Sequence, residues 1–183
     1  MKTIITNDST ITEGKEYLRQ NWEKGTKCPC CNQFVKLYRR KLNSGMSYGL
    51  IQIYKIGMEI NFKDNWMKVA DELVKRQLNP ANLDYSKLHY WGLLEQKPNE
   101  DDKTKRDSGY WKITERGKKF IRNEIKLQKY VYIYNGKIQD FDGDMVGIKD
   151  CLGNNFNYVE LMGKDASLNN PKDASNHQVK MEM

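Results

Sequence analysis

Between residues 43 and 121 the hydrophobic period of the sequence changes from helical to alternating and back to helical. Apolar residues repeat at helical spacing in two segments, over 44–56 (Met46, Leu50, Ile53, Tyr54) and over 65–78 (Trp66, Val69, Ala70, Leu73). The later part of the stretch alternates apolar and polar residues, which indicates strands. The predicted order is helix 44–56, helix 65–78, short helix 81–91, strands 93–96 and 109–113, and a helix after Thr114.

Local signals set the ends of these predicted elements. Asn43 and Asp64 are suited to cap the two long helices at their N-termini. Gly57 is expected to end the first helix, Pro80 to stop the second, and Gly92 to end the third. This mixture of helices and short strands predicts an α+β fold.

The flanking segments are predicted to be simpler. A short helix is expected over 12–22, a strand or extended segment from Val35 to Arg39, and a β-hairpin in which Tyr130–Tyr134 turns at Asn135-Gly136 into 137–141. Residues 146–152 favour a short helix or turn, 156–159 an extended piece, and 163–183 a disordered tail. The expected organisation is a basic N-terminal segment (1–42), a central domain (43–129), a β-hairpin extension (130–162) and the tail.

The central domain resembles the winged helix-turn-helix family. Residues 68–73 are similar to the second helix of that family, and 86–95 are similar to its recognition helix running into the first wing strand. Residues 110–120 are similar to the second wing strand and the helix after it, where Thr114 caps the helix and a side chain at Gly117 would crowd the sheet. The resemblance implies a winged helix-turn-helix core with an N-terminal cysteine-knuckle segment and a small C-terminal β-hairpin extension.

If the short helix enters a major groove, its outer side would approach base edges. Projection at 100° per residue places Tyr85, Leu88 and Trp91 inward and leaves four residues outside: Ser86, Lys87, His89 and Tyr90. The alternative is that the helix is a packing element in a protein-binding winged helix. The wing offers Lys103, Lys105 and Arg106, but acidic neighbours make it neutral.

The chain has 31 Lys and Arg against 24 Asp and Glu, a net charge of +7 over 183 residues. From Lys24 to Met58 there is no acidic residue, and this stretch includes Arg39, Arg40 and Lys41. A polyanion is the natural partner of such a surface, because each neutralised phosphate releases condensed counterions. We therefore expect contact with double-stranded DNA or a nucleoprotein complex, although basic residues that only solubilise exposed faces are the alternative.

More widely, residues 27–162 resemble a set of uncharacterised bacteriophage proteins. The shared pattern is carried by the Cys-Pro-x-Cys knuckle, residues 39–44, residues 87–95 and residues 129–136. The resemblance implies a phage origin and action in the cytoplasm of the host cell. A second hypothesis follows, in which the protein inhibits a host factor such as a polymerase or a defence nuclease (a CRISPR effector, for example), with Tyr130, Tyr132 and Tyr134 as an adhesive interface. The alternative for these tyrosines is a half-buried hairpin with one aromatic face in the core.

The cysteines leave several interpretations open. Cys28 and Cys31 have the C-x-x-C spacing of a zinc knuckle, but a structural zinc site needs four ligands, and a homodimer sharing an ion between two knuckles is one solution. A buried turn without metal is favoured, and a redox centre would lack the strand-to-helix context of a thioredoxin-like fold. Asp140 to Asp144 resemble the front of a calcium loop, yet Cys151 stands where a bidentate Glu is required, so a solvated hairpin end is expected.

Nothing in the sequence has the signature of an enzyme, a membrane span or a secretory signal. No phosphate-binding loop, H-E-x-x-H or G-x-S-x-G motif occurs, and there are only two histidines. No apolar run reaches the roughly 18 residues of a membrane span, and polar residues interrupt the start too early for a signal peptide. The expectation is a cytoplasmic, non-enzymatic, basic protein.

Overall fold

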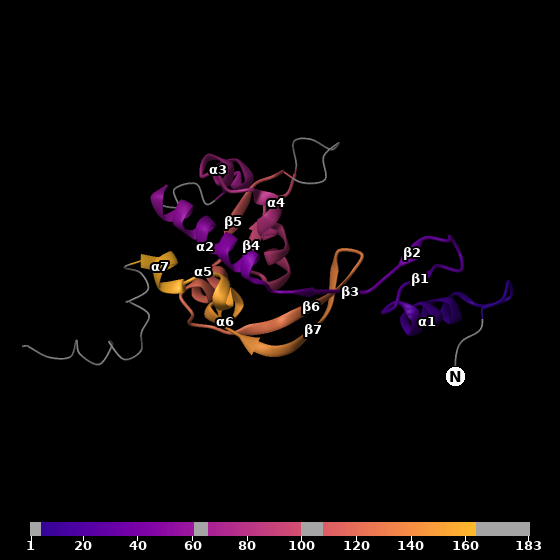
Figure 1. Cartoon of the computed structure of the whole chain (residues 1–183). Helices are drawn as coiled ribbons and strands as arrows, with labels where there is room; N and C mark the ends of the chain where they lie inside the picture. The colour runs from indigo at the N-terminus through magenta and orange to yellow at the C-terminus, as the bar shows by residue number, and fades with distance from the viewer. Residues whose placement is uncertain (1–4, 61–65, 100–107, 164–183) are drawn as a thin grey trace, which may run out of the picture. The chain divides into compact units, whose positions relative to one another are not determined.

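The structure is a computed structural model that describes residues 5–60, 66–99 and 108–163 (Figure 1). These residues form a mixed α+β fold of short helices and small antiparallel sheets. The chain divides into two compact units. Unit 1 is Met1–Lys41 with Tyr130–Gly143, and unit 2 is Leu42–Lys129 with Asp144–Met183.

Unit 1 begins with helix α1 (Ile11–Asn21), which starts at a capping box. The Thr10 hydroxyl accepts from the backbone N–H of Glu13, and the Glu13 carboxylate accepts from the backbone N–H of Thr10. Two short strands follow, β1 (Thr26–Lys27) and β2 (Phe34–Val35), and they pair with each other. Strand β3 (Tyr38–Lys41) then leads to Leu42, where unit 2 begins.

The main sheet has the order β3-β6-β7, so that β3 pairs with a strand far along the chain. Figure 1 shows β6 (Leu127–Tyr134) and β7 (Lys137–Val146) as two long neighbouring strands. Asn135 and Gly136 join them with φ values of 48° and 70°, as a type I′ hairpin turn requires. The predicted hairpin is confirmed, and both strands are longer than expected.

The sheet has an aliphatic face and an aromatic face. Val131 and Ile133 on β6 are buried, whereas the alternating Tyr130, Tyr132 and Tyr134 are half-buried. The ring centroid of Tyr134 lies 5.4 Å from that of Trp22, at the end of α1. The hairpin is half-buried, as one alternative predicted, but the face in the core is aliphatic and not aromatic.

Unit 2 is organised around helix α2 (Ser44–Glu59), which is buried on nearly every side. The Asn43 side chain accepts from the backbone N–H of Met46, which confirms the predicted cap. The residues predicted to form its apolar face, Met46, Leu50, Ile53 and Tyr54, are all buried. Helices α3 (Val69–Lys75), α4 (Pro80–Leu83), α5 (Glu115–Ile121) and α6 (Ile148–Leu152) all pack against α2.

The remaining elements of unit 2 are short. A 3-10 helix, η1 (Tyr85–Trp91), precedes strand β4 (Leu94–Gln96), which pairs antiparallel with β5 (Trp111–Ile113). A second 3-10 turn, η2 (Gly153–Asn155), separates α6 from α7 (Tyr158–Met162). Gly92 ends η1 with φ 69°, as predicted from its position.

Three predicted helix ends in unit 2 are wrong, and one of them is the end of α3 (Val69–Lys75), which stops before residue 78. Helix α2 continues past Gly57, which is buried in the helix, to Glu59. Helix α3 begins only at Val69, because the backbone of Met67 exchanges hydrogen bonds of 2.9 Å with that of Trp111 and is held extended. The predicted cap at Asp64 lies outside the described residues.

The predicted helix over 81–91 is also wrong. Asp84 has a left-handed backbone with φ 49°, which separates the four-residue α4 from the 3-10 helix η1. A 3-10 helix has three residues per turn, so the predicted inward spacing of Tyr85, Leu88 and Trp91 still holds: Leu88 and Trp91 are buried and Tyr85 is half-buried.

The C-terminal part differs from the expectation in two ways. Asp140 to Asp144 lie within strand β7 instead of forming a hairpin end. The extended piece predicted over 156–159 is helical from Tyr158, because Asn157 caps α7 by accepting from the N–H groups of Val159 and Glu160. Helix α6, by contrast, is the predicted short helix. The residues after 163 lie outside the described residues.

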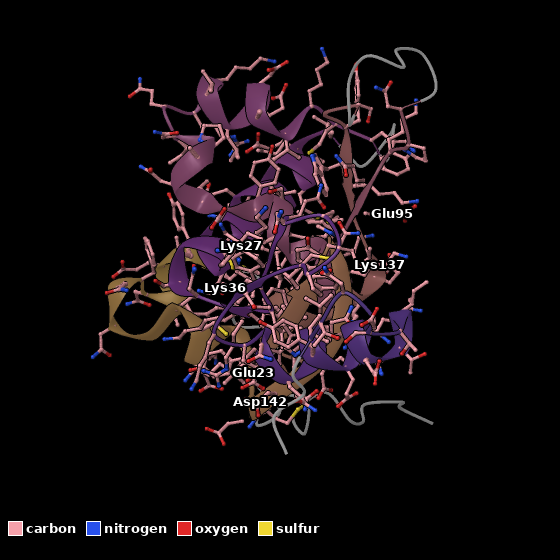
Figure 2. All side chains as sticks on the ribbon, turned by 90° about the vertical axis from the view of Figure 1, so that its right-hand side faces the viewer. Glu23, Lys27, Lys36, Glu95, Lys137 and Asp142 are labelled. Carbon is pink, nitrogen blue, oxygen red and sulfur yellow. The ribbon has the colours of Figure 1, made fainter. Side chains whose placement is uncertain are left out.

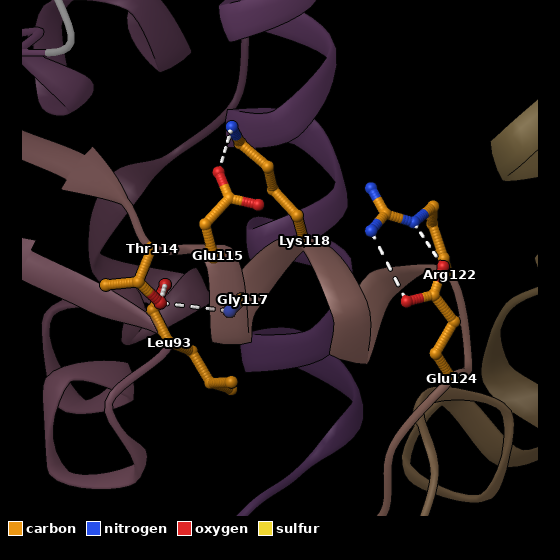
Figure 3. Close-up of polar contacts among 7 residues, drawn as sticks. All are labelled: Leu93, Thr114, Glu115, Gly117, Lys118, Arg122 and Glu124. Atoms are coloured by element: carbon orange, nitrogen blue, oxygen red, sulfur yellow. Dashed lines mark hydrogen bonds and ion pairs between the residues drawn. The ribbon is translucent and has the colours of Figure 1, made fainter.

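The junction between β4, β5 and α5 is tightly built (Figure 3). The Thr114 hydroxyl accepts from the backbone N–H of Gly117 at 2.9 Å and donates to the carbonyl of Gly92 at 2.6 Å. A Cβ atom on Gly117 would lie 2.3 Å from the carbonyl oxygen of Leu93. The predicted cap and the predicted crowding at Gly117 are both confirmed.

Candidate nucleic-acid interface

The predicted base-reading residues all lie on η1, but most are occupied by contacts within the protein. The His89 ring contacts the Tyr90 ring at a centroid distance of 3.9 Å, and its Nδ1 contacts the Ser86 carbonyl oxygen. Ser86, Lys87 and Tyr90 are half-buried, and only His89 is exposed. Lys87 forms no ion pair with the described residues, so it is the side chain of this group best placed to hold an anion.

The predicted basic residues Arg39, Arg40 and Lys41 lie on β3, whose four residues are all exposed. Arg39 differs from its neighbours. Its guanidinium lies 3.0 Å from Asp142 and 3.4 Å from the centre of the Tyr130 ring. In the described part of the chain, neither Arg40 nor Lys41 has an ion pair, which leaves these two cations for a partner.

The sequence offers Asp142 only as part of a calcium-loop pattern and gives no sign of its contact with Arg39, because the two residues are 103 positions apart. The hydrogen bond from Arg39 lowers the pKa of Asp142, with a further contribution from the backbone N–H of Gly143. The same contact raises the pKa of Arg39. Figure 2 labels Asp142, together with Lys27 on β1 and Lys36 just after β2.

We expect unit 1 to lose the stabilisation that the Arg39–Asp142 ion pair provides when the pH is lowered. A carboxylate whose pKa is depressed by folding stabilises the fold above its unfolded pKa, and that contribution is lost as the pH falls through the folded pKa. The effect is small because both side chains are about half exposed. An NMR titration of the Asp142 carboxyl should show its pKa rising in Arg39→Gln, with Arg40→Gln as the control. The same pKa of Asp142 in wild type and in Arg39→Gln would contradict the contact between Arg39 and Asp142.

A group of cations that the sequence did not reveal lies where β4 and β5 pair, at the base of the predicted wing. Lys68 and Lys97 lie 5.5 and 5.8 Å from the centre of the Tyr110 ring, and Lys112 lies 4.5 Å from that of Trp66. We call Lys68, Lys97, Lys112, Trp66 and Tyr110 the wing-base cluster.

The Met67–Trp111 bridge assembles this cluster, because it aligns the segment before α3 with β5. Lys112 is also paired with Glu95, labelled in Figure 2, at 3.0 Å. Lys68 and Lys97 are exposed and have no ion pair with the described residues. The alternation Trp66-x-Lys68 and Tyr110-x-Lys112 is the one sequence signal that could have pointed to the cluster. Of the predicted wing cations, Lys103, Lys105 and Arg106 lie outside the described residues.

Three cations of α5 and the residue after it are held by contacts within the protein. In α5 and just beyond it, Lys118 pairs with Glu115 and Arg122 with Glu124 (Figure 3). Arg116 donates from Nε to the carbonyl of Trp91 at 3.0 Å. These contacts lower the capacity of α5 to bind a polyanion.

The cysteine knuckle forms the turn between β1 and β2. Cys28 is half-buried, and Cys30 and Cys31 are exposed with free thiols, so the expected buried turn is wrong. Across residues 5–60, 66–99 and 108–163, no group of three or more His, Cys, Asp or Glu side chains is arranged to hold a metal ion. A zinc ion held by Cys28 and Cys31 and shared between two copies of the chain stays a prediction.

No protein-family model, curated protein or solved structure matches the chain. In the described part of the chain, the helices lack the length and apolar character needed to cross a bilayer. The fold and its surfaces define an α+β protein that carries exposed cations beside aromatic rings in each of its units.

Proposed function

We propose that the chain is a winged-helix protein that binds duplex DNA, mainly through the phosphate backbone. The wing-base cluster is the observation that carries this proposal, because it holds two exposed lysines beside one tyrosine ring. In support of the fold assignment, helix α3, the α4–η1 segment, the paired strands β4 and β5, and helix α5 follow one another in the order of a winged helix.

Phosphate contacts suit these lysines. An ammonium group over an aromatic ring is attracted by the ring while its remaining N–H groups stay available to an anion. Lys87 on η1 and, in unit 1, Arg40 and Lys41 on β3 supply further cations without ion pairs among the described residues. These contacts neutralise phosphates and release counterions.

Base reading is expected to be weak. The 3-10 helix η1 is seven residues long, and its His89 and Tyr90 rings are packed on each other. Phosphate contacts position a protein on DNA but carry no sequence information. We therefore expect binding that depends steeply on salt and varies little with sequence.

Fluorescence anisotropy with a labelled duplex tests this proposal. The wild-type protein should bind at low salt and weaken steeply as salt rises. The double variant Lys68→Glu/Lys97→Glu should lose about tenfold or more in affinity, since two phosphate contacts become repulsive. Lys87→Glu and Arg40→Glu/Lys41→Glu should each weaken binding as well.

Lys149→Glu is the matched control for the wing-base variant. Lys149 also lies over a tyrosine ring, 5.0 Å from the centre of Tyr158, and belongs to the same unit, but it is on α6. The affinity of Lys149→Glu for the duplex should stay within about twofold of wild type. The proposal would be contradicted if the wild-type protein did not bind duplex DNA or bound it independently of salt. Equal losses of affinity in Lys68→Glu/Lys97→Glu and Lys149→Glu would show that the wing-base cluster is not part of the DNA-binding surface.

A second candidate function is binding and inhibition of a host protein by a phage-encoded chain. It is favoured by the edge strand β7, where Ile138 is 45 % exposed, and by the half-buried tyrosines of the neighbouring strand β6. An open strand edge can pair with a strand of a partner. A pull-down from host lysate distinguishes the two functions: one stoichiometric protein partner that survives nuclease treatment and is lost in Ile138→Lys favours the second.

A further inference from the structure

Helix α1, strand β2 and the β6–β7 hairpin line a cavity of about 290 Å³ in unit 1, which we call the α1 cavity. One face of α1 and its C-terminal cap contributes four residues at i, i+3, i+4 and i+7: Lys15, Leu18, Arg19 and Trp22. The N–H of Leu37 donates to the carbonyl of Trp22 at 2.8 Å, which holds the chain after β2 at the end of α1. This contact brings the buried Val35 into the wall of the cavity.

The wall of the α1 cavity is aromatic and aliphatic. The rings of Trp22 and Tyr134 both line it, with centroids 5.4 Å apart and planes inclined at 51°. Both side chains are half-buried, so part of each ring surface stays accessible from the cavity. Leu18 and Val35 complete the apolar wall. A flat aromatic group can pack against such a wall, because ring contacts add to the gain from burying its apolar surface.

Two cations lie at the mouth of the cavity. Lys15 and Arg19 are exposed, and none of the ion pairs among the described residues includes either of them. At this i, i+4 spacing on one helix face the two like charges repel each other. A doubly charged anion held between them would relieve the repulsion. A phosphate group has this charge, and its oxygens accept hydrogen bonds from both an ammonium and a guanidinium group.

The third element of the α1 cavity is the amide of Gln139, which is exposed on β7. The amide donates one N–H to the carbonyl of Lys137 at 3.3 Å. Its carbonyl oxygen and second N–H offer an acceptor and a donor side by side, which matches the polar edge of a nucleobase. The volume is at the lower end of the range for small-molecule pockets, roughly 300–1,000 Å³. The cavity therefore suits one nucleotide and not a longer ligand.

We propose that the α1 cavity binds a single nucleotide that carries a terminal phosphate. The base packs against Trp22 and Tyr134, and the phosphate lies between Lys15 and Arg19. Two sources offer this chemistry, a free nucleoside monophosphate and the 5′-phosphorylated end of a single strand. The site belongs to unit 1, whereas the wing-base cluster belongs to unit 2, so the inference does not rest on duplex binding.

An NMR titration of the ¹⁵N-labelled full-length protein with adenosine monophosphate tests the site. The chain has four tryptophans, and the indole N–H signal of Trp22 is the one that disappears in Trp22→Phe. This signal should shift on addition of the nucleotide and reach saturation. Adenosine should bind at least about tenfold more weakly, because it lacks the phosphate and loses the charge-assisted hydrogen bonds.

The double variant Lys15→Gln/Arg19→Gln should bind adenosine monophosphate at least about tenfold more weakly than wild type, with an affinity close to that for adenosine. Lys24→Gln/Lys27→Gln is the matched control. It removes the same charge from the same unit, but neither residue lines the α1 cavity. Its affinity for the nucleotide should stay within about twofold of wild type.

Two single-stranded deoxyadenosine hexamers, with and without a 5′-phosphate, distinguish the sources. A strand end is the ligand if the phosphorylated hexamer binds more tightly than both adenosine monophosphate and the unphosphorylated hexamer; otherwise the ligand is the free nucleotide. The proposal would be overturned if adenosine monophosphate left the Trp22 signal in place or bound no more tightly than adenosine. Equal losses of affinity in the two double variants would overturn it as well.

Discussion

Replacing Gly117 with alanine is expected to lower the free energy of unfolding of unit 2 by about 3 kcal/mol or more. The added Cβ would lie 2.3 Å from the carbonyl oxygen of Leu93 and 2.9 Å from Cγ1 of Ile113. The Leu93 carbonyl is held in place, because it accepts a hydrogen bond from the backbone N–H of Thr114 at 3.1 Å. Helix α5 would have to shift away from the β4–β5 sheet.

Gly14→Ala provides the control for this substitution. Gly14 lies inside helix α1, and its nearest neighbour for an added Cβ is the Pro29 side chain at 4.0 Å. Alanine there should be neutral or stabilise unit 1 by about 0.5–1 kcal/mol, since it lowers the entropy of the unfolded chain. Urea denaturation followed by tryptophan fluorescence measures both variants. Wild-type stability in Gly117→Ala would show that the close approach to Leu93 does not exist.

Replacing Leu73 with alanine is expected to cost about 2–5 kcal/mol. Leu73 is fully buried on α3, so the substitution removes its packing and leaves a cavity that the surrounding helices fill only in part. The loss should appear as a lower urea midpoint with an unchanged slope.

The next residue on the same helix is the matched control. Val74 is 61 % exposed, and Val74→Ala should change stability by no more than about 0.5 kcal/mol. An equal loss of stability in Leu73→Ala and Val74→Ala would mean that Leu73 does not lie on the buried face of α3.

The sequence predicted the elements of unit 2 better than their ends. From 44 to 121 the order of helices and strands was right apart from the segment over 81–91, because the helical period of 44–56 and the alternation of 93–96 and 109–113 are strong. The end of α2 and the start of α3 were misplaced for different reasons. Gly57 stays helical because it is buried and the interior around α2 favours continued packing. At the start of α3, the backbone pairing of Met67 with Trp111 competes with the helix that the apolar spacing predicted there.

The sequence predicted some residues of the candidate site but not how the cations lie relative to one another. The sequence correctly found the exposed cations of β3 and the inward residues of η1. It missed the wing-base cluster, because Lys68 and Lys97 lie far apart along the chain and meet only over the ring of Tyr110. It also counted Arg39 as available, although a carboxylate on β7 holds it.

Features that depend on a few consecutive residues were determined by the sequence alone. The Asn135-Gly136 turn, the caps at Asn43 and Thr114 and the reversal at Gly92 belong to this class. Each is fixed by a local backbone conformation or by a side chain that reaches a backbone group three residues away. Tertiary structure alone decided which strands pair, where α3 begins and which cations keep a free charge, because these depend on groups that are distant in sequence and meet only in the fold.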